Sequence, residues 1–151
     1  MLKNHITNVY MYSREIISYT LSFFIVTLLG VYGLNLPGII SGNEKLVDSY
    51  YYDNIKFFIP FDYFLILLYF LVAYYFSTLF NVKTRKQYLL IIILTTILIS
   101  GGFMLYFLSN PVSNNFFSQW FHAVSYKAVI YDIILLSLMY IVYVKIYSII
   151  S

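Results

Sequence analysis

The sequence predicts an all-α integral membrane protein, a four-helix bundle with both termini on the cytoplasmic side and a short interfacial helix before the fourth span. Two observations lead to this fold class. Of the 151 residues, 62% are hydrophobic and only 10% are charged, whereas charged residues make up about a quarter of an ordinary soluble domain. The chain also contains four apolar runs, each long enough to cross a hydrocarbon core of about 30 Å.

The four spans are expected at residues 16–36, 57–80, 88–108 and 126–146 of a single domain, 1–151. The first span follows Lys3 and Arg14, as the apolar part of a signal peptide would. Its apolar run is too long for a signal peptide and no small-residue cleavage site follows, so the span is expected to be retained. The stretches LNLPGIISGNEK, NVKTRKQ and SNPVSNN are rich in turn-forming or polar residues and separate the spans.

The distribution of basic residues predicts the orientation. With both termini in the cytoplasm, six of the nine Lys and Arg residues lie on that side and three on the other, as the positive-inside rule requires. The six are Lys3, Arg14, Lys83, Arg85, Lys86 and Lys145, and the three are Lys45, Lys56 and Lys127. The triplet Lys83, Arg85 and Lys86 is also a candidate site for anionic lipid headgroups, although orienting the chain explains it without a ligand.

Composition argues against several classes of function. The chain has no cysteine, which removes disulfides, thiol redox chemistry and thiolate metal sites. His5 and His122 lack neighbouring ligand residues, so neither a metal nor any other cofactor is expected. The basic residues lie at the ends of spans and form no continuous patch, so nucleic acid is not an expected partner. No constellation of catalytic residues is visible, and the protein is not expected to be an enzyme.

Two carboxylic acids stand inside apolar spans. Asp132 lies five residues after Lys127, or about 7.5 Å of helix rise from the outer end of the fourth span. Asp62 lies at a similar depth in the second span. An acid surrounded by hydrocarbon costs several kcal/mol, so such residues normally face the bundle interior or water.

The third span places small residues in the same layer as these acids. Its Ser100, Gly101 and Gly102 lie six to eight residues from its outer end, and small residues let helices approach closely or leave room beside a larger group. We therefore expect a polar cleft that opens outward and is formed by Asp62, Asp132, Ser100, Gly101 and Gly102.

Both acids also have structural interpretations. Pro60 suits the first turn of a helix, where the Asp62 carboxylate would be stabilised by unpaired amides and by the helix dipole. Asp132 is too far from a helix start for that role, but a structural hydrogen bond, for example to a tyrosine hydroxyl, would account for it.

The stretch before the fourth span predicts a short helix in the headgroup plane. One helical side of FFSQWFHAV is apolar and consists of Phe116, Phe117, Trp120, Phe121 and Val124. Trp120 and His122 are expected at the membrane interface, as is Lys127, whose tail would extend outward. His122 as a pH sensor beside the cleft is the alternative. The tyrosines of SYYYD, residues 49–53, suit contact with headgroups or with another protein.

The second half of the chain carries one resemblance. The stretch WFHAVSYKAVIYDIILLSLMYIVY, residues 120–143, has an aromatic lead-in followed by KAVIYD. It resembles uncharacterised small multi-pass membrane proteins of giant nucleocytoplasmic DNA viruses. The resemblance implies a virally encoded protein of a host or virion membrane, with no catalytic residue to carry over.

Three functions are compatible with these features. The first is a non-enzymatic structural or assembly component that contacts membrane lipids and other membrane subunits or further copies of itself. The second is a small proton or cation transporter or channel that uses Asp132 and Asp62. The third is an accessory subunit of a respiratory complex, which would place the chain in an organelle inner membrane.

Overall fold

The structure is a computed structural model that describes the backbone of residues 2–150 and the side chains of residues 13–150. The side chains of Lys3 and His5 therefore lie outside the described residues. Every regular element in the described part of the chain is a helix, and the expected all-α fold is confirmed.

Four long helices make up most of the chain. They are α1 (Leu2–Val26), which continues as the π-helical segment η1 (Thr27–Gly33), α4 (Ile55–Leu79), α5 (Arg85–Leu108) and α7 (Tyr126–Ile150). Short elements connect them. They are α2 (Leu36–Ser41), α3 (Glu44–Asp48) and the π-helical segment η2 (Ser49–Asp53) before α4, and α6 (Phe116–Val124) before α7.

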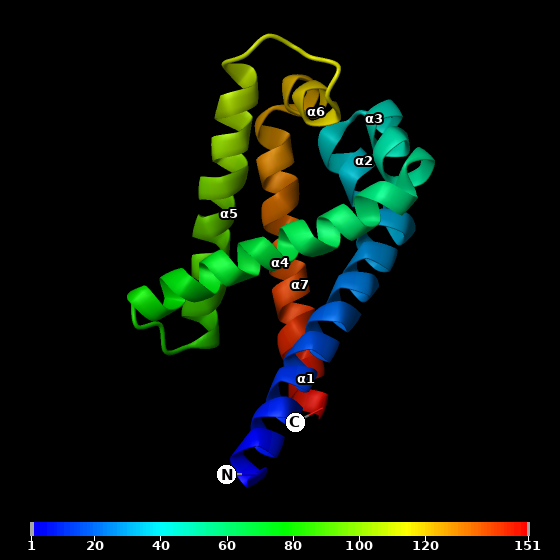
Figure 1. Ribbon diagram of the computed structural model, residues 1–151. Helices are drawn as coiled ribbons and strands as arrows, with labels where there is room; N and C mark the ends of the chain where they lie inside the picture. Colours follow the sequence, from blue (N-terminus) through cyan, green and yellow to red (C-terminus); the bar gives the residue numbers. More distant parts are fainter. Residues whose placement is uncertain (1, 151) are drawn as a thin grey trace.

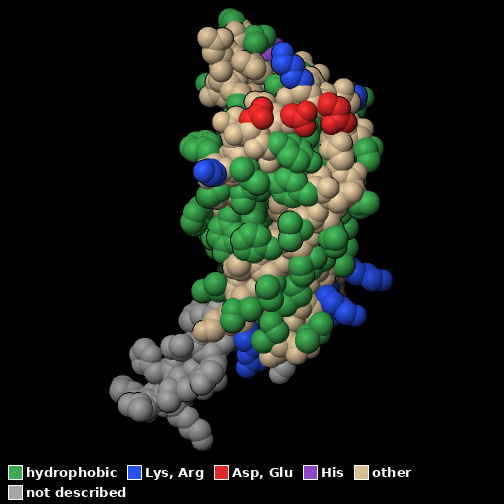
Figure 2. Space-filling model, turned by 90° about the vertical axis from the view of Figure 1, so that its right-hand side faces the viewer, with side chains coloured by type: hydrophobic (Ala, Val, Ile, Leu, Met, Phe, Trp, Pro, Cys, Tyr) green, Lys and Arg blue, Asp and Glu red, His purple; other side chains and the backbone are tan. Residues whose placement is uncertain are grey.

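Each long helix is long and apolar enough to cross a membrane. The candidate spans are Ser13–Gly33, Ile55–Leu79, Arg85–Leu108 and Tyr126–Ile150, and they overlap the four predicted ranges. A broad band of hydrophobic side chains covers the visible face between two ends that carry the charged groups (Figure 2). This is the surface expected of a multi-pass membrane protein.

Local signals in the sequence explain where the helices begin and end. The side chain of Asn35 accepts a hydrogen bond from the amide of Gly38 at 3.2 Å and so caps the start of α2. Gly42, with φ of 68°, ends that helix in the left-handed conformation that glycine adopts readily. Thr84 and Gln87 form a reciprocal capping box that begins α5.

Helix α7 lies at the centre of the bundle and packs along both α1 and α5. Ser18 and Ser22 of α1 are fully buried, and small residues at this spacing let helices approach closely. Helix α4 crosses the bundle obliquely in Figure 1. It is tied to α1 through Tyr63, whose hydroxyl lies 2.9 Å from Thr20 Oγ1 and whose carbonyl accepts a hydrogen bond from Tyr19.

The bundle has two ends, which carry different connecting segments. Both termini lie at one end together with the turn between α4 and α5, and we call this the termini end (Figure 1). Helices α2, α3 and α6 lie at the opposite end, with η2, and we call this the loop end. The short connections between the long helices therefore alternate between the two ends, as four successive crossings of a membrane require.

Candidate functional site

Ser100 connects three of the long helices through hydrogen bonds. Its Oγ donates to Asp132 Oδ2 of α7 at 2.6 Å, and the hydroxyl of Tyr69 in α4 lies 2.7 Å from the same Oγ. A serine hydroxyl has a single hydrogen, so when Ser100 donates to the Asp132 carboxylate, Tyr69 donates to Ser100. The side chains of Ser100 and Tyr69 are buried, and the chain of bonds holds one oxygen of Asp132 in place.

Asp62 is held by a residue from the loop end. The hydroxyl of Tyr50, in η2, donates to Asp62 Oδ1 at 2.5 Å. Helix α4 begins at Ile55, so Pro60 lies inside the helix and Asp62 lies about two turns beyond its start. The interpretation that Asp62 stabilises the first turn of its helix is therefore wrong, because that effect is confined to the terminal turn.

Asp62 and Asp132 line the same cavity, which has a volume of about 300 Å³. Its walls come from α4, α5, α6, α7 and η2, so it lies in the half of the bundle nearest the loop end. Eleven of the seventeen lining side chains are aromatic, four are aliphatic and two are these acids. Ser100 is buried next to Asp132 and does not itself line the cavity.

The lining positions follow helical spacing along each wall. On α4 the cavity is lined by Phe61, Asp62, Leu65, Ile66 and Tyr69, and on α7 by Tyr131, Asp132, Leu135 and Leu136. Each set is one face of a helix. Tyr69, Phe103 and Phe107 also line the cavity and were not among the residues expected in the cleft. Tyr69 follows Asp62 by seven residues, and Phe103 and Phe107 follow Ser100 by three and by seven residues. These helical spacings place each of them on the same side of its helix as the polar residue, and they are the signal that identifies them.

Two glycines expected in the cleft lie outside it. Gly101 and Gly102 do not line the cavity, and a Cβ atom added at either position would meet nothing within 4 Å. They lie on a face of α5 different from that of Ser100, because successive helical residues are rotated by about 100°. The expectation that they form part of the cleft is therefore wrong.

The tyrosines of residues 49–53 do not form an exposed contact surface as a group. Tyr50 and Tyr51 are buried and line the cavity, and only Tyr52 is exposed. The hydroxyl of Tyr51 lies 2.8 Å from that of Tyr131. Burial and then the neighbouring Asp62 carboxyl raise the pKa of Tyr50, and burial and then Tyr131 raise the pKa of Tyr51. Both hydroxyls therefore remain protonated at neutral pH.

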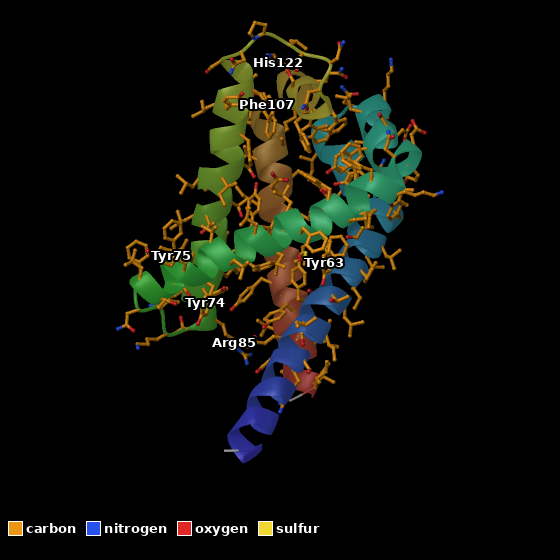
Figure 3. The ribbon with its side chains drawn as sticks, in the orientation of Figure 1. Tyr63, Tyr74, Tyr75, Arg85, Phe107 and His122 are labelled. Atoms are coloured by element: carbon orange, nitrogen blue, oxygen red, sulfur yellow. The ribbon has the colours of Figure 1, made fainter. Side chains whose placement is uncertain are left out.

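Helix α6 covers the cavity with its aromatic side. Phe116, Phe117, Trp120 and Phe121 all contribute to the lining. The ring of Phe121 stacks on that of Phe107 in α5, with centroids 5.5 Å apart. Phe107 lies close to the loop end in Figure 3. The predicted short helix is therefore present, and much of its apolar side packs on the bundle.

The other two residues predicted at the interface are held by the chain itself. His122 lies at the loop end (Figure 3), where its Nδ1 is 2.8 Å from the carbonyl of Ser118, and it does not line the cavity. Lys127 Nζ donates to the carbonyl of Ser41 in α2 at 3.3 Å. The tail of Lys127 therefore ends on α2 at the loop end, and its place at the membrane interface stays a prediction.

The basic turn lies far from this cavity. Lys83, Arg85 and Lys86 are exposed at the termini end, where Figure 3 shows Arg85. Their contact with lipid headgroups stays a prediction. Among the described residues, no group of three or more His, Cys, Asp or Glu side chains is placed to hold a metal ion.

Comparison of the chain with protein-family models, with curated proteins and with solved structures found no match.

Proposed function

We propose that this protein is a small cation transporter or channel whose binding site is the cavity lined by Asp62 and Asp132. The observation that carries the proposal is that two acids from different helices line one cavity inside an otherwise apolar bundle. A membrane protein meets a large free-energy cost when it places one acid among apolar groups, and residues of this kind normally mark a pathway for ions or protons.

The hydrogen bonds leave each acid able to bind a cation. Asp132 accepts through Oδ2 and Asp62 through Oδ1. No other described residue donates to the remaining oxygen of either carboxylate. One oxygen of each group is therefore fixed by the protein, and the other is available to a positive charge in the cavity.

The orientation of the site is part of the proposal. We place the termini end in the cytoplasm because its exposed groups include Lys83, Arg85, Lys86 and Lys145. The loop end carries Glu44, Asp48 and Asp53, which are exposed and offset its basic residues. In this orientation the cavity lies in the half of the bundle nearest the non-cytoplasmic side, beneath α6.

The transport proposal is tested by flux in liposomes. The full chain is reconstituted and the movement of protons, Na⁺ and K⁺ is followed in the native protein and in Asp132→Asn. Asp48→Asn is the matched control, because Asp48 is an exposed acid outside the cavity. Flux of at least one of these cations should fall at least about tenfold in Asp132→Asn and stay unchanged in the control. Equal flux in all three proteins contradicts the proposal.

The second candidate is a structural or assembly component, and one feature of α4 favours it. Tyr74 and Tyr75, near the end of α4, are 64% and 65% exposed and project from the bundle in Figure 3. Exposed tyrosines suit contact with another membrane subunit. The partner would belong to a host or virion membrane, or to a respiratory complex of an organelle inner membrane.

The assembly candidate predicts a particle larger than a single chain. Light scattering of the protein extracted in mild detergent should give a protein mass well above 17.8 kDa. Tyr74→Ser with Tyr75→Ser should return it to the mass of the single chain. A single-chain mass for the native protein contradicts this candidate and leaves the transport proposal unaffected.

A further inference from the structure

We propose that the cation bound in this cavity is an organic ammonium ion with an apolar body, a ligand class that rests on the proposed cation site and makes it more specific. A volume of about 300 Å³ is at the lower end of the range for small-molecule sites in proteins, which runs from about 300 to 1,000 Å³. The cavity is thus large enough for a small organic ligand.

The hydroxyl groups of the lining are already used within the protein. Four tyrosines line the cavity, and each hydroxyl has a partner. Tyr50 donates to Asp62, Tyr69 bonds to Ser100, and Tyr51 pairs with Tyr131. A bare Ca²⁺ ion needs about six to eight oxygen ligands. This lining presents few oxygens beyond the unbonded oxygen of each acid, so it is poorly suited to replace the water shell of an inorganic ion.

The apolar part of the lining suits the rest of an organic cation. Rings of Phe, Tyr and Trp supply most of the wall, and none of the described lining residues is basic. Aromatic rings attract ammonium groups through their negative faces, and the attraction grows when water is excluded. The two acids supply the countercharge. An ammonium ion that carries carbon substituents needs this combination of a negative group and an apolar surround.

The position of the cavity also fits a ligand that dissolves in the bilayer. Phe103 of α5 lines the cavity and is nevertheless 45% exposed. The cavity wall at Phe103 is therefore also part of the outer surface of α5, a helix that is long and apolar enough to lie in the membrane. A cation with an apolar body concentrates in this region, because apolar groups leave water for hydrocarbon.

The chain offers a direct readout of binding. Trp120 is the single tryptophan of the sequence, and it lines the cavity. The full protein in nanodiscs of uncharged lipid is titrated with benzyltrimethylammonium, and with neopentylbenzene, which has the same shape without the charge. Trp120 emission is followed in the native protein, in Asp62→Asn with Asp132→Asn, and in Asp48→Asn with Asp53→Asn as the control for lost negative charge.

We expect the affinity for benzyltrimethylammonium to fall at least about tenfold in the Asp62→Asn, Asp132→Asn protein. The affinity for neopentylbenzene should change less than about twofold, which also verifies that the cavity is intact in this variant. The control with Asp48 and Asp53 replaced should behave as the native protein does.

The outcomes separate this inference from the proposed function. If the Asp62→Asn, Asp132→Asn protein loses affinity for both compounds equally, or retains its affinity for both, the proposal of an organic ammonium ligand is overturned. If that result accompanies Asp132-dependent flux of protons, Na⁺ or K⁺ in liposomes, the cation site stands and its ligand is an inorganic cation. If flux is also independent of Asp132, both proposals fail. The native protein provides a check without mutation, because benzyltrimethylammonium must change Trp120 emission in a saturable way.

Discussion

Ser100 Oγ lies 2.6 Å from Asp132 Oδ2, and this hydrogen bond joins α5 to α7 at the only acid that α7 contains. The same Oγ bonds to Tyr69 of α4. One small hydroxyl thus orients the Asp132 carboxyl beside the cavity and fixes the relative positions of three helices.

Replacing Ser100 tests this structural role. Ser100→Ala removes the donor to Asp132 and leaves the buried Tyr69 hydroxyl without this partner. The free energy of unfolding should fall by about 0.6–2 kcal/mol, the range for polar contacts between membrane helices. Unfolding in mixed micelles with increasing denaturing detergent measures it. Ser109→Ala is the control, since the hydroxyl of exposed Ser109 donates to the carbonyl of Leu105, one turn earlier in the chain. Equal losses in both variants would contradict this role of Ser100.

Tyr50 should make the fold sensitive to alkali. Burial raises the pKa of Tyr50 in the folded protein, while an unfolded tyrosine ionises near pH ~10. Above that pH the unfolded state binds fewer protons than the folded state, so stability should decrease as the pH rises and should not depend on this group below it. Tyr50→Phe keeps the ring that stacks on Phe58 and should weaken the alkaline loss.

The test is thermal unfolding, monitored by circular dichroism, at several pH values between about 8 and 11. This range brackets the usual tyrosine pKa of about 10. Tyr52→Phe is the matched control, because Tyr52 belongs to the same segment and is exposed. An alkaline slope that is the same in the native protein and in Tyr50→Phe would rule out this role for Tyr50.

Two glycines should respond in opposite ways to alanine. Gly101 has open space beside its Cα, so Gly101→Ala should leave the unfolding free energy unchanged or raise it by up to about 1 kcal/mol through helix propensity. Gly42 has φ of 68°, so Gly42→Ala should lower it by about 1 kcal/mol or more. Thermal unfolding of both variants measures the difference. A destabilised Gly101→Ala protein would contradict the open space beside Gly101.

The absence of cysteine from the sequence makes the orientation directly testable. A single cysteine at Asp53, at Lys86 or at Leu98 is labelled in sealed cells or vesicles with a maleimide that cannot cross membranes. Asp53→Cys should react from the non-cytoplasmic side and Lys86→Cys only after the membrane is opened. Leu98→Cys, which replaces an exposed apolar residue in the middle of α5, should react in neither case while the membrane is intact. Reaction of Lys86→Cys in sealed cells with no reaction of Asp53→Cys would reverse the proposed orientation.

The sequence by itself determined the number, length and helical nature of the spans. Runs such as residues 88–108 are apolar over a length that only a helix can use to cross a bilayer, since a helix satisfies its own backbone hydrogen bonds. It also placed Asp62, Asp132 and Ser100 in one layer, because depth follows from the count of residues along a helix of known rise.

Tertiary structure alone decided which side of each helix faces the cavity. Gly101 follows Ser100 in the sequence at nearly the same depth, but it is rotated away from Asp132 and lies outside the lining. The position of Tyr50 between two spans predicts contact with headgroups or with another protein, yet the chain folds back so that its hydroxyl reaches Asp62. The position of a residue along an apolar run sets how deep it lies. Helix rotation and loop packing set what the residue contacts, and both depend on pairings between distant parts of the chain.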